Sequence, residues 1–119
     1  MSDEVLVVEA SRRYSLEQLA ALAASPLRAA GAERAVVFGS WARGNADGFS
    51  DLDLAVVLDT DLPRLDRPRA LAALVDALPL PVDLLVYTPD EFEAGLRDRF
   101  GVFDAIAREG VTIYARSQS

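Results

Sequence analysis

Three residue types that serve many enzymes are missing from this sequence, which has no cysteine, no histidine and no lysine, so that its 12 basic residues are all arginines. Without cysteine there is no disulfide framework, no thiolate metal site and no cysteine nucleophile. The lack of histidine excludes the usual zinc sites and Ser-His-Asp catalysis. The lack of lysine excludes Schiff-base chemistry and the phosphate-loop lysine. Catalysis must therefore use carboxylates, hydroxyls and arginines, which suits hard metal ions with oxygen ligands.

A basic surplus and long apolar runs are also missing. The formal net charge is -7 and the isoelectric point is about 4.5. This acidity argues against nucleic acid or anionic lipid as a partner, because both need a basic face. The apolar run near the start, Val5–Val8, is far too short for a signal peptide or a membrane span. We therefore expect a soluble cytoplasmic protein with no membrane and no nucleic-acid partner.

What is present fits one folded domain. The chain has 119 residues, of which 51% are hydrophobic and 26% charged. That length is typical of a single domain with its own core, and the hydrophobic fraction is too high for intrinsic disorder. We therefore expect residues 1–119 to form one domain.

Hydrophobic periodicity and turn residues predict alternating helices and strands. Two capping boxes mark helix starts, at Ser15 with Gln18 and at Thr88 with Glu91. Strands are predicted over 5–8, 35–38, 51–58, 82–87 and 111–115, and helices over 15–30, 68–78 and 89–109, the last interrupted near Gly101. Residues 59–68 are turn-rich. The order predicts an α/β (α+β) fold with a single mixed sheet and helices packed against it.

Three aspartates lie where strands are predicted to begin. Asp51 and Asp53 alternate along one strand, so their carboxylates point to the same face about 6–7 Å apart. Asp83 stands at the start of a strand that can lie alongside. Three such carboxylates suit one or two Mg²⁺ ions. The alternative is that each is an ordinary strand-end or turn residue, and for an isolated Asp-x-Asp or for Asp83 alone this alternative is the more common case.

A glycine and a serine precede these aspartates at the end of another predicted strand. Gly39 and Ser40 open a short predicted helix, where free N–H groups favour an anion such as phosphate. Glycine permits close approach, serine adds a hydroxyl, and Arg43 can reach a phosphate oxygen with its guanidinium. A phosphate-binding turn beside a carboxylate pair predicts a site for a nucleoside triphosphate and Mg²⁺.

The aromatic residues admit more than one interpretation. Packing against the sheet edge is the favoured prediction for Trp41, with stacking on a base as the alternative. Phe49 fits a lid, a partner contact or a loop anchor. A core position is predicted for Phe92, Phe100 and Phe103.

Together these residues resemble the nucleotidyltransferase motif of the DNA polymerase β superfamily. The motif reads Gly-Ser, ten residues and then Asp-x-Asp, the form typical of minimal nucleotidyltransferase (MNT) domains. Supporting segments match as well, namely the Ala-Arg-Gly after Gly-Ser, the Val-Asp-Leu strand with the third acid, and Arg108–Val111 before Tyr114. The resemblance covers about residues 15–115 and implies the polymerase β-like nucleotidyltransferase fold.

The resemblance also implies a role for each residue. Asp51 and Asp53 would hold the metal that binds the triphosphate, and Asp83 would complete a second metal site or help deprotonate the acceptor. Gly39 and Ser40 would contact the β- and γ-phosphates, and Arg43 would bond a phosphate or brace the loop. The acceptor oxygen would attack the α-phosphorus and release pyrophosphate.

For a free-standing MNT domain the resemblance implies a HEPN-domain partner. The MNT member acts as antitoxin and transfers AMP from ATP to a tyrosine hydroxyl of the HEPN ribonuclease toxin. Two other functions remain open, one being a binding module that masks its partner without catalysis. The other is nucleotidylation of a small hydroxylated molecule such as an aminoglycoside, for which a homodimer would have to complete the pocket. A structural domain with a chance motif is the least favoured interpretation.

Overall fold

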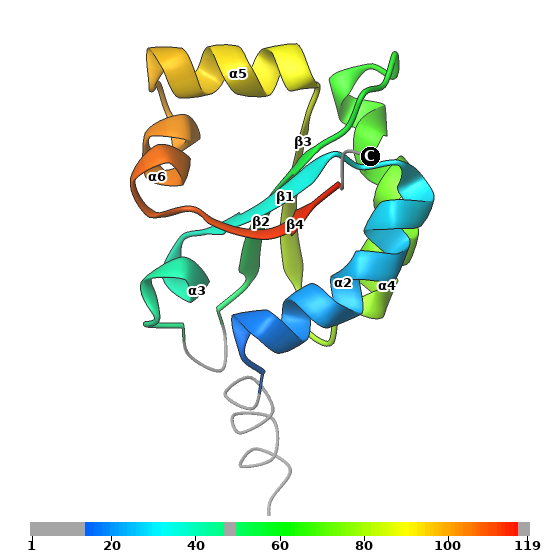
Figure 1. Cartoon of the computed structure of the whole chain (residues 1–119), viewed down its shortest axis with the longest axis vertical. Coiled ribbons are helices and arrows are strands. Elements are labelled where there is room, and N and C mark those ends of the chain that lie inside the picture. Colours follow the sequence, from blue (N-terminus) through cyan, green and yellow to red (C-terminus); the bar gives the residue numbers. More distant parts are fainter. Residues whose placement is uncertain (1–13, 47–49, 117–119) are drawn as a thin grey trace, which may run out of the picture.

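The computed structural model describes residues 14–46 and 50–116. The predicted strand Val5–Val8 and the loop residue Phe49 lie outside the described residues. A four-stranded sheet occupies the middle of the molecule, and helices lie on both sides of it (Figure 1). This arrangement confirms the predicted α/β fold with a single mixed sheet.

The sheet has the strand order β3-β2-β1-β4. Its strands are β1 (Arg34–Phe38), β2 (Leu52–Val57), β3 (Val82–Tyr87) and β4 (Val111–Ala115). The pair β1·β2 and the pair β1·β4 are antiparallel, whereas β2 and β3 are parallel. Parallel neighbours need a crossover connection, which here contains a 3-10 helix, η1 (Arg64–Leu71), followed by α4 (Ala72–Ala77).

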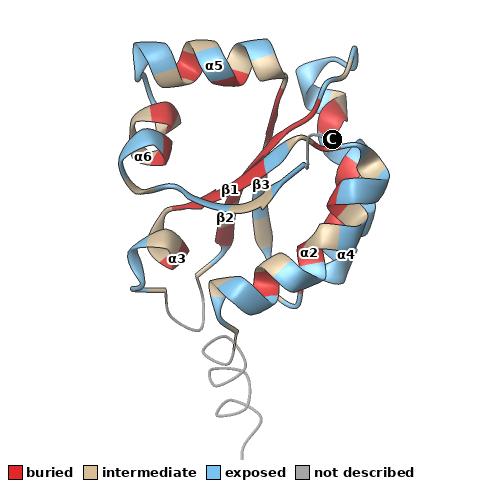
Figure 2. Ribbon diagram, viewed as in Figure 1, coloured by how far each residue is buried: buried red, intermediate tan, exposed pale blue. Residues whose placement is uncertain are grey.

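The two central strands are buried on both faces because helices cover each face (Figure 2). One face packs against α2 (Leu16–Ala30), η1 and α4. The core on this face includes Leu19, Leu27, Val37, Leu54 and Leu74, all completely buried. Alternate residues of the same strands, such as Val36 and Ala55, belong to the core on the other face.

The second face is covered by α5 (Pro89–Asp98) and α6 (Val102–Glu109). Its core is aromatic, with the rings of Tyr87 and Phe103 at a centroid distance of 4.7 Å and those of Phe92 and Phe103 at 6.0 Å. Phe92 and Phe103 are buried as predicted, but the prediction for Phe100 is wrong, because its side chain is 62% exposed. Phe100 lies in the short connection between α5 and α6, where it meets the edge of Phe103 from outside.

Both predicted capping boxes are formed. Ser15 and Gln18 exchange side-chain and backbone hydrogen bonds at the start of α2, and Thr88 and Glu91 do the same at the start of α5. Helix α2 continues past Pro26 to Ala30 and ends at Gly31, which has a left-handed conformation (φ 79°). These local signals explain why the boundaries of α2 and α5 follow from the sequence.

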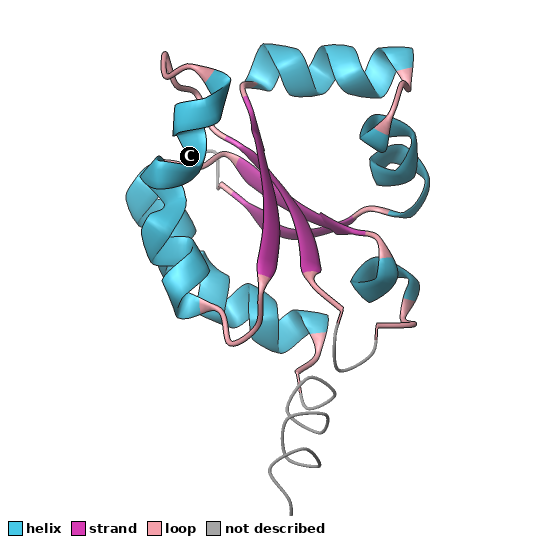
Figure 3. Ribbon diagram, turned by 180° about the vertical axis from the view of Figure 1, so that it is seen from behind, coloured by secondary structure: helices cyan, strands magenta, loops and turns pink. Residues whose placement is uncertain are grey.

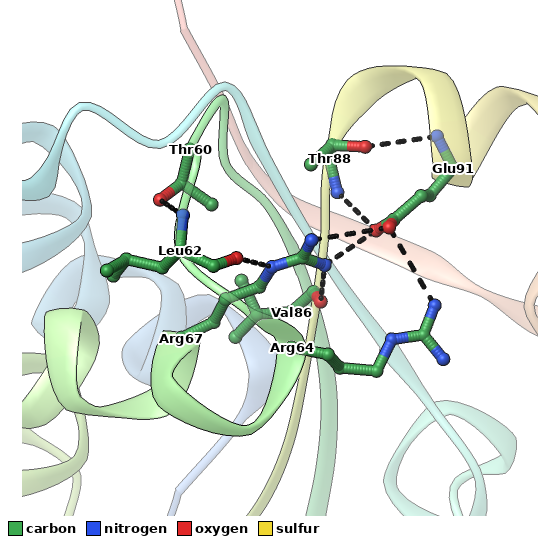
Figure 4. Close-up of polar contacts among 7 residues, drawn as sticks. All are labelled: Thr60, Leu62, Arg64, Arg67, Val86, Thr88 and Glu91. Carbon is green, nitrogen blue, oxygen red and sulfur yellow. Dashed lines mark hydrogen bonds and ion pairs between the residues drawn. The ribbon is translucent and has the colours of Figure 1, made fainter.

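The predicted helix over 68–78 differs from the structure, where η1 occupies residues 64–71 and only residues 72–77 are α-helical. Pro68 lies inside η1, where it has no backbone N–H to donate to the carbonyl four residues earlier. The residue before it, Arg67, is buried (7% exposed) and bonded to three different segments (Figure 4). Its guanidinium donates to the Leu62 carbonyl (3.0 Å), the Val86 carbonyl (3.3 Å) and both carboxylate oxygens of Glu91 (2.6 and 3.3 Å). These contacts hold the crossover against the far end of β3.

The helices lie in two groups when the molecule is seen from behind, α2 and α4 to one side and α5 and α6 to the other (Figure 3). The short helix α3 (Ser40–Arg43) lies at the end of the sheet opposite α5. None of the helices within residues 14–46 and 50–116 has the length and hydropathy needed to cross a bilayer.

Candidate active site

The sheet register brings two of the three predicted aspartates side by side. In the parallel pair β2·β3, Asp53 is directly opposite Asp83, and in the antiparallel pair β1·β2 it is opposite Phe38. Asp51 lies one residue before β2 and is exposed. Asp83 is exposed as well, whereas Asp53 is half-buried because strands lie on both sides of it. Two carboxylates therefore meet at the sheet end, with the third close by in sequence.

The side chain of Asp53 belongs to the same face as α5 and α6. Along β2, Leu52, Leu54 and Val56 pack in the core beneath α2, whereas Ala55 and Val57 pack in the core beneath α5 and α6. Alternation places Asp53 on the latter face, at the strand end that these helices leave uncovered. The aspartates therefore lie on a surface at the edge of a well-packed core.

Electrostatics at this end of the sheet oppose full ionisation of the carboxylates. Burial raises the pKa of Asp53, and the charges of Asp83 and then Asp51 raise it further. A hydrogen bond between the Asp53 and Asp83 side chains acts in the same direction, and the charge of Arg43 opposes it. An aspartate held near two others in this way is stabilised by a cation, which removes the repulsion.

The turn after β1 is shaped to accept the Asp53 side chain. Gly39 has φ 75° and ψ -151°, a conformation essentially limited to glycine. A Cβ atom at Gly39 would collide with the Asp53 carboxylate, so the missing side chain lets the carboxylate lie against the backbone. After this turn, Ser40 begins α3, which ends at Gly44 in a left-handed conformation. Gly39 therefore lies beside Asp53, and Ser40 follows it at the start of α3.

Arg43 points to a partner that sequence reasoning missed. Its Nη1 atom forms an ion pair with the Oε2 atom of Glu109 at 2.8 Å. The same Glu109 oxygen accepts a hydrogen bond from the Gly39 backbone N–H at 3.0 Å. Of the two roles predicted for Arg43, this contact is consistent with bracing the loop. The sequence contains one hint, the Arg108–Val111 segment counted within the resemblance, but nothing in it pairs Glu109 with a turn 70 residues earlier.

Trp41 packs into the core as the favoured prediction holds. Its side chain is 9% exposed and its indole N–H donates to the Ser50 carbonyl at 3.4 Å. This bond ties α3 to the segment that leads into β2. Trp41 also lines an open depression of about 500 Å³ between α3 and the start of α2. This depression is not lined by Asp51, Asp53 or Asp83.

The donor set fits Mg²⁺ bound together with a substrate. Within residues 14–46 and 50–116, no group of three or more acidic side chains is arranged to hold an ion by itself. Mg²⁺ commonly uses only one or two protein carboxylates and takes its other ligands from water and substrate phosphate oxygens. Asp53 and Asp83 lie in contact, and their negative charges repel each other. The pair therefore offers the one or two carboxylates that such an ion uses.

The comparisons with known proteins show the family. Residues 27–108 match the model of the family described as nucleotidyltransferase domain. The match covers more than half of the chain, so the chain belongs to the nucleotidyltransferase domain family. None of the curated proteins compared with the chain matches it.

Solved structures share the fold. One is a toxin–antitoxin with AMP-PNP, which is 22% identical with a TM-score of 0.54 over 76% of this chain and 68% of that one. Another is a putative nucleotidyltransferase from Sulfolobus solfataricus, 21% identical with a TM-score of 0.54 over 85% of this chain and 84% of that one. A third is a mutant of the MntA-HpeT toxin–antitoxin, 19% identical with a TM-score of 0.53 over 76% and 68%.

Proposed function

From its membership in the nucleotidyltransferase domain family, we propose that the chain transfers AMP from ATP to a hydroxyl group in a Mg²⁺-dependent reaction. The observation that carries this proposal is the pairing of Asp53 with Asp83 against the Gly39 turn. It places carboxylates for a cation directly against the turn that opens α3.

In this proposal each predicted residue keeps its role. Asp51 and Asp53 hold the ion that binds the triphosphate, and Asp83 shares a second ion or takes the proton from the acceptor. Ser40 and the turn at Gly39 contact the β- and γ-phosphates. The Gly39 N–H itself donates to Glu109, so Ser40 supplies the donors of that contact, while Arg43 braces the turn through Glu109. Bound Mg²⁺ supplies charge neutralisation for the attacking and leaving oxygens. The acceptor oxygen bonds to the α-phosphorus as the bond to the bridging oxygen breaks, and pyrophosphate leaves.

We further propose that the acceptor is a tyrosine of a HEPN-domain toxin and that the chain acts as its antitoxin. Two of the structures with this fold are toxin–antitoxin assemblies, one of them with AMP-PNP. The exposed position of Asp51 and Asp83 supports the same idea, because it leaves the aspartates accessible to a second protein. A site of this kind needs a partner to complete the acceptor pocket.

The test uses the chain together with the toxin encoded beside it, with Mg²⁺ and ATP labelled at either the α- or the γ-phosphate. We expect label on the toxin from the α position alone. Label from the γ position would indicate a kinase and contradict the proposal. A small molecule labelled in place of the toxin would leave the transfer reaction standing and overturn the acceptor.

Variants separate catalysis from masking. We expect Asp51→Asn and Asp53→Asn to abolish labelling and to release toxin activity. Asp59→Asn is the matched control, since Asp59 is an exposed aspartate that follows the opposite end of the same strand. If the two variants still neutralised the toxin fully, the chain would act by masking without catalysis.

A further inference from the structure

Glu109 joins two parts of the turn that faces the aspartates. Its Oε2 atom accepts from the Gly39 N–H at 3.0 Å and from Arg43 Nη1 at 2.8 Å. The Glu109 side chain is 17% exposed, against 49% for Arg43. A carboxylate this far buried is stabilised by the two donors it receives, and each donor is in turn held in place.

The fold dictates this contact. Strand β4 pairs with β1 so that Val111 is opposite Val37, two residues before Gly39. Glu109, two residues before Val111 at the end of α6, is therefore brought next to the turn. Gly110 permits the close passage, because a Cβ atom there would meet Val36 Cγ1 at 2.8 Å. Ile106, which is 5% exposed, anchors α6 in the core on this face.

The bond to Glu109 controls where the Arg43 charge lies. Arg43 belongs to the helix that follows Gly39, and its backbone N–H donates to the Gly39 carbonyl at 3.1 Å. The Asp53 carboxylate lies against Gly39, in the space that a Cβ atom would fill. The Arg43 charge already acts on Asp53, where it lowers the pKa of the carboxyl. Once its present partner is gone, the guanidinium is free to form an ion pair with Asp53 and would then compete with a cation for the same carboxylate.

We propose that Glu109 is a positioning residue of the site: it fixes the Gly39 peptide and holds the Arg43 guanidinium away from Asp53, so that the aspartates stay free to bind a cation. This inference rests on the proposed function, since it assigns the aspartates to a cation. It adds a residue from α6 to the site and gives Arg43 a structural task that depends on its charge.

The test measures two properties of the full chain, the first without nucleotide and the second in the presence of the non-hydrolysable ATP analogue AMP-PNP. One is the resonance of the Gly39 amide, assigned by NMR, and the other is the affinity for Mn²⁺, used as a probe for divalent cations. The variants are Glu109→Gln, which keeps an acceptor oxygen but removes the charge, and Glu109→Gln combined with Arg43→Gln. Asp104→Asn is the matched control, since it removes an acid from the same helix whose ion pairs are with Arg99 and Arg108.

We expect Glu109→Gln to shift the Gly39 amide and to weaken Mn²⁺ binding about three- to tenfold, the size of one nearby charge in a partly hydrated site. Removing Arg43 in that background restores the affinity, which a loss of structure alone would not do. Asp104→Asn changes neither property. An unshifted Gly39 amide, or Mn²⁺ binding that stays weak in the double variant, overturns the proposal.

Two further results are decisive. If Glu109→Gln does not fold, Arg43→Gln alone tests the idea. Removing the Arg43 guanidinium that Glu109 holds must leave the Mn²⁺ affinity within about twofold of that of the original protein, and a larger loss overturns the proposal. If the original protein binds no Mn²⁺ in the presence of AMP-PNP, the proposed cation-dependent function fails, and the Gly39 amide by itself decides whether Glu109 positions the turn.

Discussion

At the scale of single residues, Asp53 lowers the stability of the folded chain while serving the proposed activity. Burial and the neighbouring Asp83 and Asp51 raise its pKa, so the charged form is less favourable in the folded chain than in the unfolded chain. For an acid with a raised pKa, this penalty is present above the folded pKa. It disappears as the pH falls below the ordinary aspartate pKa of about 3.9, where both states are protonated.

The first prediction follows from that sign. Without divalent cations at pH 7, Asp53→Asn should be more stable than the original protein, and the difference should close as the pH falls toward 3.9. Adding Mg²⁺ should stabilise the original protein and leave the variant nearly unchanged. Urea unfolding with and without Mg²⁺ measures both effects. A variant that is less stable at pH 7 without cation would contradict the raised pKa.

The same substitution should also suppress transfer. An ion that neutralises charge in the transition state is worth several kcal/mol, so Asp53→Asn should lower the rate at least about a hundredfold. Single-turnover labelling of the acceptor measures this loss. Asp59→Asn should remain within about twofold, because Asp59 is exposed beyond the opposite end of β2.

A second prediction at this scale concerns two glycines in one turn. Gly39 and Gly44 both have positive φ, but only a Cβ at Gly39 would meet Asp53, while one at Gly44 has open space. We expect Gly39→Ala to lower the free energy of unfolding by about 2 kcal/mol or more and to abolish transfer. Gly44→Ala should lose about 1 kcal/mol and keep most activity. Equal losses of activity would show that the space beside Asp53 is not what matters.

At the scale of elements, the crossover between β2 and β3 depends on one ion pair. Arg67 in η1 is buried. Both terminal nitrogens of its guanidinium donate hydrogen bonds to the carboxylate of Glu91, at the start of α5 (Figure 4). Hydrogen bonding by Arg67 lowers the pKa of Glu91, with burial opposing and the Thr88 backbone N–H adding to the effect. The pair closes the parallel connection whose register places Asp83 beside Asp53.

The third prediction tests this pair and its pH dependence. Glu91→Gln should lower the free energy of unfolding by about 2 kcal/mol at pH 7, because Arg67 loses a charged hydrogen-bond partner. A lowered pKa means that the contribution is present above the ordinary glutamate pKa of about 4.3 and is lost as the pH falls through the lower folded value. Urea titrations at pH 7 and pH 3 should therefore differ, with the gap between the two proteins much smaller at pH 3. A gap of constant size would contradict the assignment.

Elements with their own local signals could be predicted from the sequence. Helices α2 and α5 have capping boxes that fix their first residues, and the central strands are apolar runs of β-branched and aliphatic residues. The start of the 3-10 helix at Arg64 could not be predicted, because the contacts that hold this segment, from Arg67 to Val86 and Glu91, are with residues 19 and 24 positions later in the sequence. The exposed position of Phe100 has the same origin, since its neighbours in the fold decide it.

For the site as well, only the residues with a local sequence pattern could be predicted. Spacing within one strand relates Asp51 to Asp53, and glycine and serine after a strand mark the turn, so local pattern locates both. The pairing of Asp53 with Asp83 needs the sheet register, and the contact of Glu109 with Gly39 needs the antiparallel pairing of β4 with β1. A carboxylate that acts through tertiary structure carries no local signature.

At the scale of the whole molecule, the lack of histidine, cysteine and lysine has a thermodynamic consequence. No side chain has an ordinary pKa between about 5 and 9, so the charge of the folded and unfolded chain changes little in that range. The fourth prediction is a free energy of unfolding that varies by less than about 1 kcal/mol between pH 6 and 9. Urea midpoints across that range measure it, and a clear slope would contradict it.

The surplus of acids acts at the same scale. Only three acids are assigned to the proposed metal site, so most of the net charge of -7 is distributed elsewhere. If the proposed partner presents a basic face, association should weaken as salt increases, since the Debye length falls from about 10 Å at 0.1 M to about 3 Å at 1 M. Association rates measured across that range test this fifth prediction, and rates independent of salt would contradict it.

The site is assembled from four segments, the turn at Gly39, the starts of β2 and β3, and the end of α6 at Glu109. Because these segments lie far apart in the sequence, the site forms in a fixed order in a chain that is still being synthesised. The turn and both aspartate strands are synthesised well before Glu109. Strand β1 pairs with β2 first and gains its second neighbour only when β4 has been synthesised. A nascent chain can therefore begin to fold early but cannot complete the turn beside Asp53 until α6 has emerged, so the onset of activity depends on the synthesis of α6.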